Sequence, residues 1–273
     1  MEHIRHAIEK ARKKRMESEG QSDTAAHQDQ KLSEAAALSA KWRALRSTDV
    51  RPAVFKRNRI TTFRAGPQAA PFDAMRTKLL YEMRGKNWRR LAITSPGVDC
   101  GKSTICLNLA FSMARQLDLK VMVIELDLRH PSIARMLNLD SSMNLVKVLN
   151  NVAPAQDHMT RIGEDMIIAP SQRTQDSAEL LQGVAAAHAI DRLEADYQPD
   201  VMLFDMPPML AVDDTMAFVD QVDATLLIGA AEATTADQIA RCKRDLEART
   251  NLIGVVLNKC RYPDPLEAYS YGI

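Results

Sequence analysis

An apolar run that leads into a glycine-containing loop constrains the fold of this chain more than any other feature. Residues 91–94 form the apolar run, and an apolar helical pattern extends from about residue 102 to residue 117. A strand, a tight loop and a helix in this order bring backbone N–H groups and a helix N-terminus to face an anion. The segment therefore predicts an α/β fold built around a phosphate-binding loop.

The loop carries the residue types that phosphate binding needs. Gly97 and Gly101 allow close approach of the backbone, Lys102 can reach the β and γ phosphates of a nucleotide, and Ser103 can ligate Mg²⁺. Pro96 occupies the first glycine position of the strict G-x-x-x-x-G-K-[ST] pattern. A chance match to this pattern is less plausible here, because the loop lies between a predicted buried strand and an apolar helix. The predicted ligands are ATP and Mg²⁺, bound by Gly97, Val98, Asp99, Cys100, Gly101, Lys102, Ser103 and Thr104.

From about residue 71, apolar runs alternate with amphipathic helical stretches, which is typical of a mainly parallel sheet with helices on both faces. This is the P-loop NTPase-like α/β class. Right-handed crossovers would bring the carboxyl ends of the strands to one edge, where ligands bind. We expect strands at residues 91–94, 121–126, 166–169, 201–205, 225–229 and 252–257, and helices at residues 72–83, 102–117, 177–193 and 236–248.

The chain divides into three parts by composition. Residues 1–66 form a basic N-terminal extension, residues 67–261 the P-loop domain, and residues 262–273 a tyrosine-containing tail. Ile4, Ile8 and Ala11 recur at helical spacing before the basic run at residues 12–15, so the extension is expected to be partly helical or disordered. It is either a solvated arm or a segment that docks on a partner or an anionic membrane surface.

Bulk properties exclude several classes of protein. A net charge of +1 on 273 residues argues against nucleic-acid binding through the whole surface. The four cysteines, which show neither metal-ligand spacing nor a disulfide framework, favour a reducing compartment. Neither a signal peptide nor an apolar run of about 18 residues is found, so we expect a cytoplasmic protein.

Two further apolar runs each end in carboxylates. Glu125 and Asp127 end the run at residues 121–126, and Asp205 ends the run at residues 201–205. Charges in such runs are costly unless a metal or a hydrogen-bond partner compensates them. Asp205 can hold Mg²⁺ through its water shell, and Asp127 can ligate the ion or accept a proton from an attacking hydroxyl. Each carboxylate alone could instead be a cap or a surface-loop residue.

Over about residues 70–260 these motifs resemble the bacterial tyrosine autokinases of capsule and exopolysaccharide biosynthesis, a branch of the deviant P-loop class that includes the MinD and ParA ATPases. Residues 125–129, Glu-Leu-Asp-Leu-Arg, are similar to the Walker A′ motif, usually written Asp-x-Asp-x-Arg. Residues 204–208 resemble Walker B, and residues 177–181 and 254–258 resemble further family segments. The wider class carries a second lysine in the loop, which is absent here, and this favours the kinase branch.

The resemblance implies transfer of the ATP γ-phosphoryl group to tyrosines. Lys102 would stabilise the phosphates, and Asp127 would orient or deprotonate the tyrosine with help from Glu125. The predicted Mg²⁺ ligands are Ser103, Asp127 and Asp205. Further nucleotide contacts are predicted for Arg129 and Asn258. The candidate phosphate acceptors are Tyr262, Tyr269 and Tyr271.

The implied partners are other copies of the chain and a transmembrane polysaccharide co-polymerase, whose cytoplasmic tail would activate the kinase and bring it to the inner face of the cell membrane.

The sequence departs from the family pattern at three places. Glu125 replaces the usual first aspartate, and His130 stands where another basic residue is common. The Glu-x-x-Arg-x-x-Arg oligomerisation helix is only partly recognisable around Asp73, Arg76 and Lys78. Two alternatives remain open: a MinD/ParA-like ATPase switch, and a nucleotide-binding scaffold without kinase activity.

Overall fold

The computed structural model describes Gln30 and residues 33–261, so the acceptor candidates Tyr262, Tyr269 and Tyr271 and the helix expected near residues 4–11 lie outside the described residues. Contacts divide the chain into two units, Met1–Ala44 and Leu45–Ile273. In the first unit, residues 33–44 are helical. The second unit contains the sheet and every site discussed below.

The second unit begins earlier than the boundary that we expected at residue 66. Phe55 and Ile60 are buried in its hydrophobic core. The ring of Phe55 stacks on Phe63 at a centroid distance of 4.6 Å and meets Phe111 edge-on at 4.9 Å. The polar and basic composition of residues 1–66 conceals these few apolar anchors, which place residues 45–66 with the P-loop domain.

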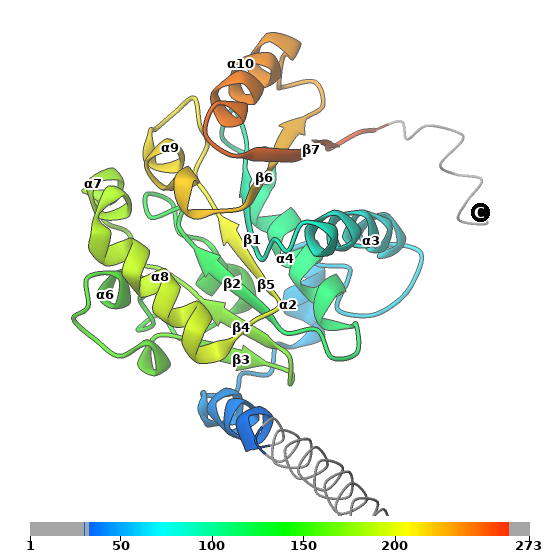
Figure 1. The fold of residues 1–273 in the computed structure, drawn as a ribbon. Coiled ribbons are helices and arrows are strands. Elements are labelled where there is room, and N and C mark those ends of the chain that lie inside the picture. The colour runs from blue at the N-terminus through cyan, green and yellow to red at the C-terminus, as the bar shows by residue number, and fades with distance from the viewer. Residues whose placement is uncertain (1–29, 31–32, 262–273) are drawn as a thin grey trace, which may run out of the picture. The chain divides into compact units, whose positions relative to one another are not determined.

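Within the described residues, seven strands form one sheet in the order β3-β4-β2-β5-β1-β6-β7. All neighbouring pairs are parallel except β3 and β4, which run antiparallel. The mainly parallel sheet confirms the predicted fold class (Figure 1). The strands are β1 (Arg90–Thr94), β2 (Val121–Glu125), β3 (Thr160–Ile162), β4 (Met166–Ala169), β5 (Val201–Asp205), β6 (Ala224–Ala230) and β7 (Asn251–Asn258).

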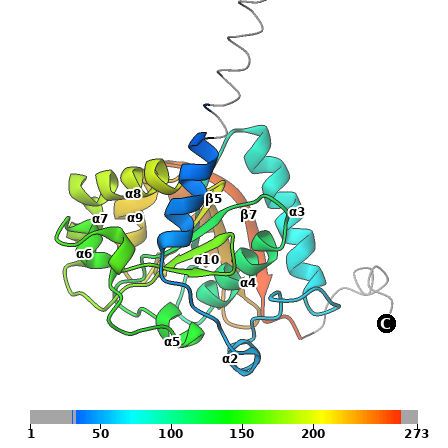
Figure 2. The ribbon, with the colours of Figure 1, turned by 90° about the horizontal axis from the view of Figure 1, so that it is seen from below.

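Helices cover both faces of this sheet, as predicted. Leu91 and Ile93 of β1 belong to the core cluster that includes α3 and α4. On the opposite face, Phe204 of β5 packs on Phe218 of α9 at 5.4 Å. Figures 1 and 2 show α3 beside α4 on one side and α7, α8 and α9 on the other. The helices are α2 (Pro52–Arg57), α3 (Ala70–Gly85), α4 (Lys102–Ala114), α5 (Ile133–Leu137), α6 (Leu145–Leu149), α7 (Ser177–Gln182), α8 (Val184–Tyr197), α9 (Asp214–Phe218) and α10 (Ala236–Glu247), with short 3-10 turns at Ala155–Asp157 and Val219–Gln221.

Several elements differ from those expected: α2, α5, α6 and α9 are short helices that were not predicted, one expected helix is broken, and one strand was missed. The helix expected at residues 177–193 is broken into α7 and α8 at Gly183, whose backbone is extended at φ −67° and ψ 140°. β3 was not predicted, because three residues are too short for a periodic pattern. It is supported at the sheet edge by the backbone of Thr48, which donates to Arg161 O at 2.8 Å.

In the described part of the chain, no helix is long and apolar enough to cross a membrane.

Candidate functional site

The loop between β1 and α4 has the backbone shape of an anion-binding turn. Asp99 and Gly101 adopt left-handed conformations at φ 57° and φ 90°. The Ser95 hydroxyl donates to Gly97 O at 2.7 Å and so closes the start of the loop. No side chain caps the N-terminus of α4, which begins at Lys102. The first N–H groups of a helix lack intrahelical acceptors, and here they lie in the position where phosphate oxygens can accept from them.

Neighbouring segments hold this loop from two sides. The N–H groups of Met209 and Leu210, which follow β5, donate to Ser95 O at 2.8 Å and Pro96 O at 3.1 Å. From the end of β7, the Asn258 amide donates to Cys100 O at 2.8 Å. Asn258 therefore supports the loop directly, and its contact with the nucleotide stays a prediction. The Cys100 side chain is buried, so this residue offers its backbone to the site.

Gly101 is expected to be irreplaceable for the loop conformation. An added Cβ would lie 2.4 Å from Asn258 Nδ2, and the residue already has φ 90°. We expect Gly101→Ala to lower the free energy of unfolding by about 1–3 kcal/mol, because strain of this kind is only partly relieved by local shifts. Gly97→Ala is the matched control, since a Cβ there meets nothing within 4 Å. Denaturant unfolding of both variants without nucleotide measures the difference; equal stabilities would contradict the assigned strain.

The structure brings Lys102, Asp127 and Asp205 together, as predicted. β2 lies beside β5, and the N–H groups of Leu126 and Asp127 both donate to Asp205 O at 2.9 Å. Lys102 Nζ lies 3.8 Å from Asp127 Oδ2, and both side chains are buried. Asp127 Oδ1 accepts from the His130 N–H at 3.1 Å. The motif residues therefore form one charged cluster beneath the loop.

Asp205 is the chemically most unusual member of this cluster. It is fully buried, and among the described residues neither carboxylate oxygen has a hydrogen-bond partner. Burial raises the pKa of Asp205 to about 7, although nearby Lys102 opposes this shift. A buried carboxylate without partners is costly and calls for a compensating ligand.

The residues present fit a divalent cation. Asp205 and Asp127 supply carboxylate oxygens, and Ser103 supplies a hydroxyl beside them. The described residues contain no group of three His, Cys, Asp or Glu side chains that could hold a metal by themselves. That composition suits Mg²⁺, which keeps several waters and is held by few protein ligands together with substrate phosphates.

The raised pKa predicts how the stability of the metal-free protein depends on pH. The folded state retains a proton on Asp205 up to about pH 7, whereas the unfolded chain releases it near the ordinary aspartate pKa of 3.8. Between these values the folded state binds more protons, so the free energy of unfolding falls as pH rises, and the loss is complete above the folded pKa. Thermal unfolding in EDTA should therefore give a lower Tm at about pH 8 than at about pH 5, with a smaller difference in Asp205→Asn. Identical pH profiles for the two proteins would count against this assignment.

Glu125, which is expected to assist Asp127, is held by backbone amides. This side chain is fully buried; one oxygen accepts from the N–H groups of Ser132 at 2.5 Å and Ile133 at 2.8 Å, and the other accepts from Ser171 N–H at 2.8 Å. Burial raises the pKa of Glu125 to about 7, while the three amides oppose this shift. Because backbone amides contact both of its oxygens, Glu125 holds the start of α5 and the segment after β4, and its assistance to catalysis stays a prediction.

Arg129, a predicted nucleotide contact, is paired within the chain. Its guanidinium forms a two-pronged ion pair with Asp214 of α9, with Nε 2.9 Å from Oδ2 and Nη2 3.0 Å from Oδ1. Asp214 is fully buried and also accepts from the Ser177 hydroxyl at 2.6 Å. Arg129 therefore links the Walker A′-like loop to α7 and α9, and it is not among the residues that line the cavity at the loop.

An open cavity of about 730 Å³ lies at the loop, within the size range of ligand sites. Sequence reasoning missed several residues that line it. Arg59 lies in the segment taken for an extension, Arg135 lies in the short helix α5, and Lys259 directly follows β7. No motif marks these three cations. The lining residues are Arg59, Val98, Asp99, Gly101, Lys102, Ser103, Thr104, Asp127, His130, Ser132, Arg135, Met136, Pro208 and Lys259.

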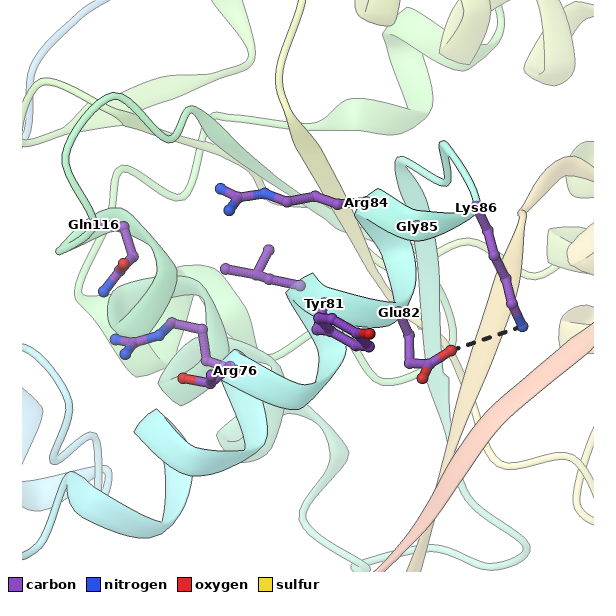
Figure 3. Close-up of a pocket in the computed structure, with 9 residues that line it drawn as sticks. Arg76, Tyr81, Glu82, Arg84, Gly85, Lys86 and Gln116 are labelled. Atoms are coloured by element: carbon purple, nitrogen blue, oxygen red, sulfur yellow. Dashed lines mark ion pairs between the residues drawn. The ribbon is translucent and has the colours of Figure 1, made fainter.

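A second cavity of about 730 Å³ lies along α3 and shares no lining residue with the first. Figure 3 shows Tyr81 and Arg84 projecting from α3, and Arg76 directed toward Gln116. Two side chains of the partly recognisable oligomerisation motif are engaged within the chain, since Arg76 Nη1 donates to Ser112 O at 3.0 Å and Asp73 accepts from the Ser112 hydroxyl at 2.5 Å. Without loop N–H groups or the cluster of carboxylates, this cavity is no candidate for the nucleotide.

The geometry of the loop and its carboxylates agrees with comparisons to known proteins. A family profile described as "ParA: NUBPL iron-transfer P-loop NTPase" matches residues 89–268, which is more than half of the chain. The chain belongs to the ParA family of P-loop NTPases. As a ParA-family protein it is a nucleotide-binding protein, and the matched region starts at β1 and includes all three Walker-like motifs.

Relatives of this ParA-family chain include named tyrosine kinases, which confirms the resemblance seen in the sequence. It is 26% identical to tyrosine-protein kinase YwqD of Bacillus subtilis over 74% of this chain and 85% of YwqD. It is 29% identical to tyrosine-protein kinase Etk of Escherichia coli over 68% of this chain, a match that spans 26% of Etk. The crystal structure of the chimerical protein CapA2B2 superposes with a TM-score of 0.67 at 26% identity, covering 81% of this chain and 94% of that one.

Proposed function

We propose that this ParA-family chain is a protein-tyrosine kinase that transfers the γ-phosphoryl group of MgATP to tyrosine hydroxyls, including Tyr262, Tyr269 and Tyr271 of its own tail. One observation carries the proposal: Lys102, Asp127 and the unpartnered carboxylate of Asp205 meet at one phosphate loop. The alignment with YwqD over 85% of that kinase supports tyrosine as the acceptor.

The chain's own residues account for the main requirements of phosphoryl transfer, which are positioning and charge neutralisation. Lys102 and the N–H groups at the start of α4 would bind the phosphates, with Thr104 at the α-phosphate. Ser103, Asp127 and Asp205 would hold Mg²⁺, which neutralises charge on the transferred group. Asp127 lies at the surface of the cavity, where its carboxylate can accept the hydrogen bond of an incoming tyrosine hydroxyl and take its proton.

The activity is proposed to regulate polymerisation and export of capsule or exopolysaccharide, as in the autokinases that the sequence resembles. A transmembrane polysaccharide co-polymerase would activate the kinase from the membrane, and other copies of the chain would present their tails. The protein would then act in the cytoplasm at the inner face of the cell membrane.

An ATPase switch is the second candidate, and the match to a ParA profile favours it. In that case water would replace the tyrosine hydroxyl as the nucleophile at the same loop. A scaffold that only binds nucleotide would use the loop without any chemistry.

Product analysis separates the three functions. Purified full-length protein is incubated with MgATP, with and without a cytoplasmic peptide of the co-polymerase, and both phosphotyrosine and free phosphate are measured. Kinase activity gives phosphotyrosine in at least one condition. Free phosphate alone indicates the ATPase switch, and bound ATP with neither product indicates the scaffold; both results would overturn the kinase proposal.

A further inference from the structure

Two arginines from distant parts of the chain lie on one rim of the phosphate cavity. Arg59 directly follows Asn58, whose side-chain amide donates to Met136 O at 2.8 Å. Met136 is the neighbour of Arg135 in α5, and both arginines line the cavity together with Lys102 and Asp127. The Asn58 contact therefore joins the two segments that carry these guanidinium groups.

A buried asparagine fixes this rim to the phosphate loop. The Asn108 amide donates to Arg59 O at 3.0 Å and to Thr104 O at 2.8 Å, and its oxygen accepts from Thr61 N–H at 2.8 Å. Asn108 is fully buried in α4, the helix that starts in the loop. Because one side chain joins the loop residue Thr104 to the backbone of Arg59, the Arg59 backbone is preorganised relative to the phosphate loop.

The charges of the two arginines are not neutralised by this chain's described residues. Lys102 lies beside Asp127, and Arg129 is paired with Asp214. In the described part of the chain, neither Arg59 nor Arg135 has a carboxylate within ion-pair distance, although both line a cavity. Guanidinium groups in such positions are suited to bind carboxylates or phosphates.

We propose that Arg59 and Arg135 determine substrate specificity by binding an acidic side chain two residues away from the acceptor tyrosine. The tail of a second copy supplies such a segment, since Asp264 follows Tyr262 by two positions and Glu267 precedes Tyr269 by two. In an extended peptide, residues two apart project to the same side, about 6.6–7 Å from each other. One side chain can then face Asp127 while the other faces the arginine rim. This inference rests on the proposed kinase function and names its substrate class.

Peptide kinetics with the full-length protein test the inference. The acceptor peptides have the sequence of residues 262–273, with Asp264 and Glu267 either retained or both replaced by Asn and Gln. For the unchanged enzyme we expect the neutral peptide to have about a tenfold higher KM than the acidic one, with a similar kcat, because a charge-assisted contact is lost. Arg59→Gln and Arg135→Gln should raise the KM of the acidic peptide and remove this discrimination, while the KM of ATP stays unchanged. Arg244→Gln on the exposed side of α10 is the matched control.

Two results would overturn the inference: equal KM values for the two peptides in the unchanged enzyme, or a KM increase for ATP instead of the peptide in the arginine variants. The second result would assign the arginines to the nucleotide. Absence of phosphotyrosine on every peptide would instead defeat the proposed kinase function. In that case the affinities of the two fluorescently labelled peptides are measured with protein that holds a non-hydrolysable ATP analogue. The inference requires that the unchanged protein binds the acidic peptide more tightly than the neutral one. This difference must disappear in Arg59→Gln and Arg135→Gln.

Discussion

Lys102→Met is expected to lower phosphoryl transfer by about a thousandfold or more, the largest effect of any single change in this chain. The methionine side chain has similar length but no charge, so the developing charge on the transferred phosphate loses its main protein cation. Lys102 is almost fully buried and lies 3.8 Å from Asp127, and among the described residues it forms the one ion pair of this carboxylate. Single-turnover transfer from labelled ATP measures the effect.

The same substitution leaves the carboxylate of Asp127 without its cation, so loss of folding must be distinguished from loss of chemistry. Removal of one partner from a buried ion pair can cost about 3–5 kcal/mol of stability. Lys102→Arg retains the charge and is expected to remain folded, but its planar guanidinium differs in shape from an ammonium group, and transfer should still be impaired. Lys243→Met on the exposed face of α10 is the control. Full activity in a folded Lys102→Met protein would show that the loop does not take part in phosphoryl transfer as proposed.

Asp205→Asn is expected to give the second-largest loss of activity, by about a hundredfold or more, because the variant loses a charged group that would hold Mg²⁺. The carboxylate is fully buried without a hydrogen-bond partner, so its ionised form is costly in the metal-free protein. Stability of the metal-free variant at neutral pH should therefore be equal to or higher than that of the unchanged protein. Activity is thus predicted to fall without a loss of stability.

Magnesium titrations of kcat and thermal unfolding in EDTA check both parts of this prediction. Asp118→Asn is a suitable control, because Asp118 is exposed and asparagine tolerates its left-handed conformation at φ 59°. Unchanged kcat with an unchanged magnesium dependence in Asp205→Asn would assign the ion to other ligands. A strong loss of stability would indicate that Asp205 has a structural partner.

The elements that position the site could be predicted because each has a strong sequence signal. β1, β2 and β5 are continuous apolar runs, and α4 follows a glycine-containing loop. The meeting of Asp127 and Asp205 also follows from the sequence, since the carboxyl ends of neighbouring parallel strands share one edge.

The direction of individual side chains could not be predicted in the same way. Glu125 and Arg129 belong to the same motif as Asp127, but no motif marks their partners. Glu125 accepts from the amides of Ser132 and Ile133 nearby and of Ser171 far along the chain. Arg129 pairs with the carboxylate of Asp214, which is also distant in sequence. Arg59 was missed for another reason. The polar composition of its segment conceals the apolar anchors that fold it onto α4, and only the structure reveals the Asn108 bridge to the loop.

Phosphopeptide mapping of the tail is the most direct test of tyrosine kinase activity. The full-length protein and Lys102→Met are each incubated with MgATP and digested, and the peptides that contain Tyr262, Tyr269 and Tyr271 are analysed by mass spectrometry. The proposed function predicts phosphate on at least one of these tyrosines in the unchanged protein and on none in the variant. Release of free phosphate with unmodified tail peptides, also in the presence of the co-polymerase peptide, would contradict it.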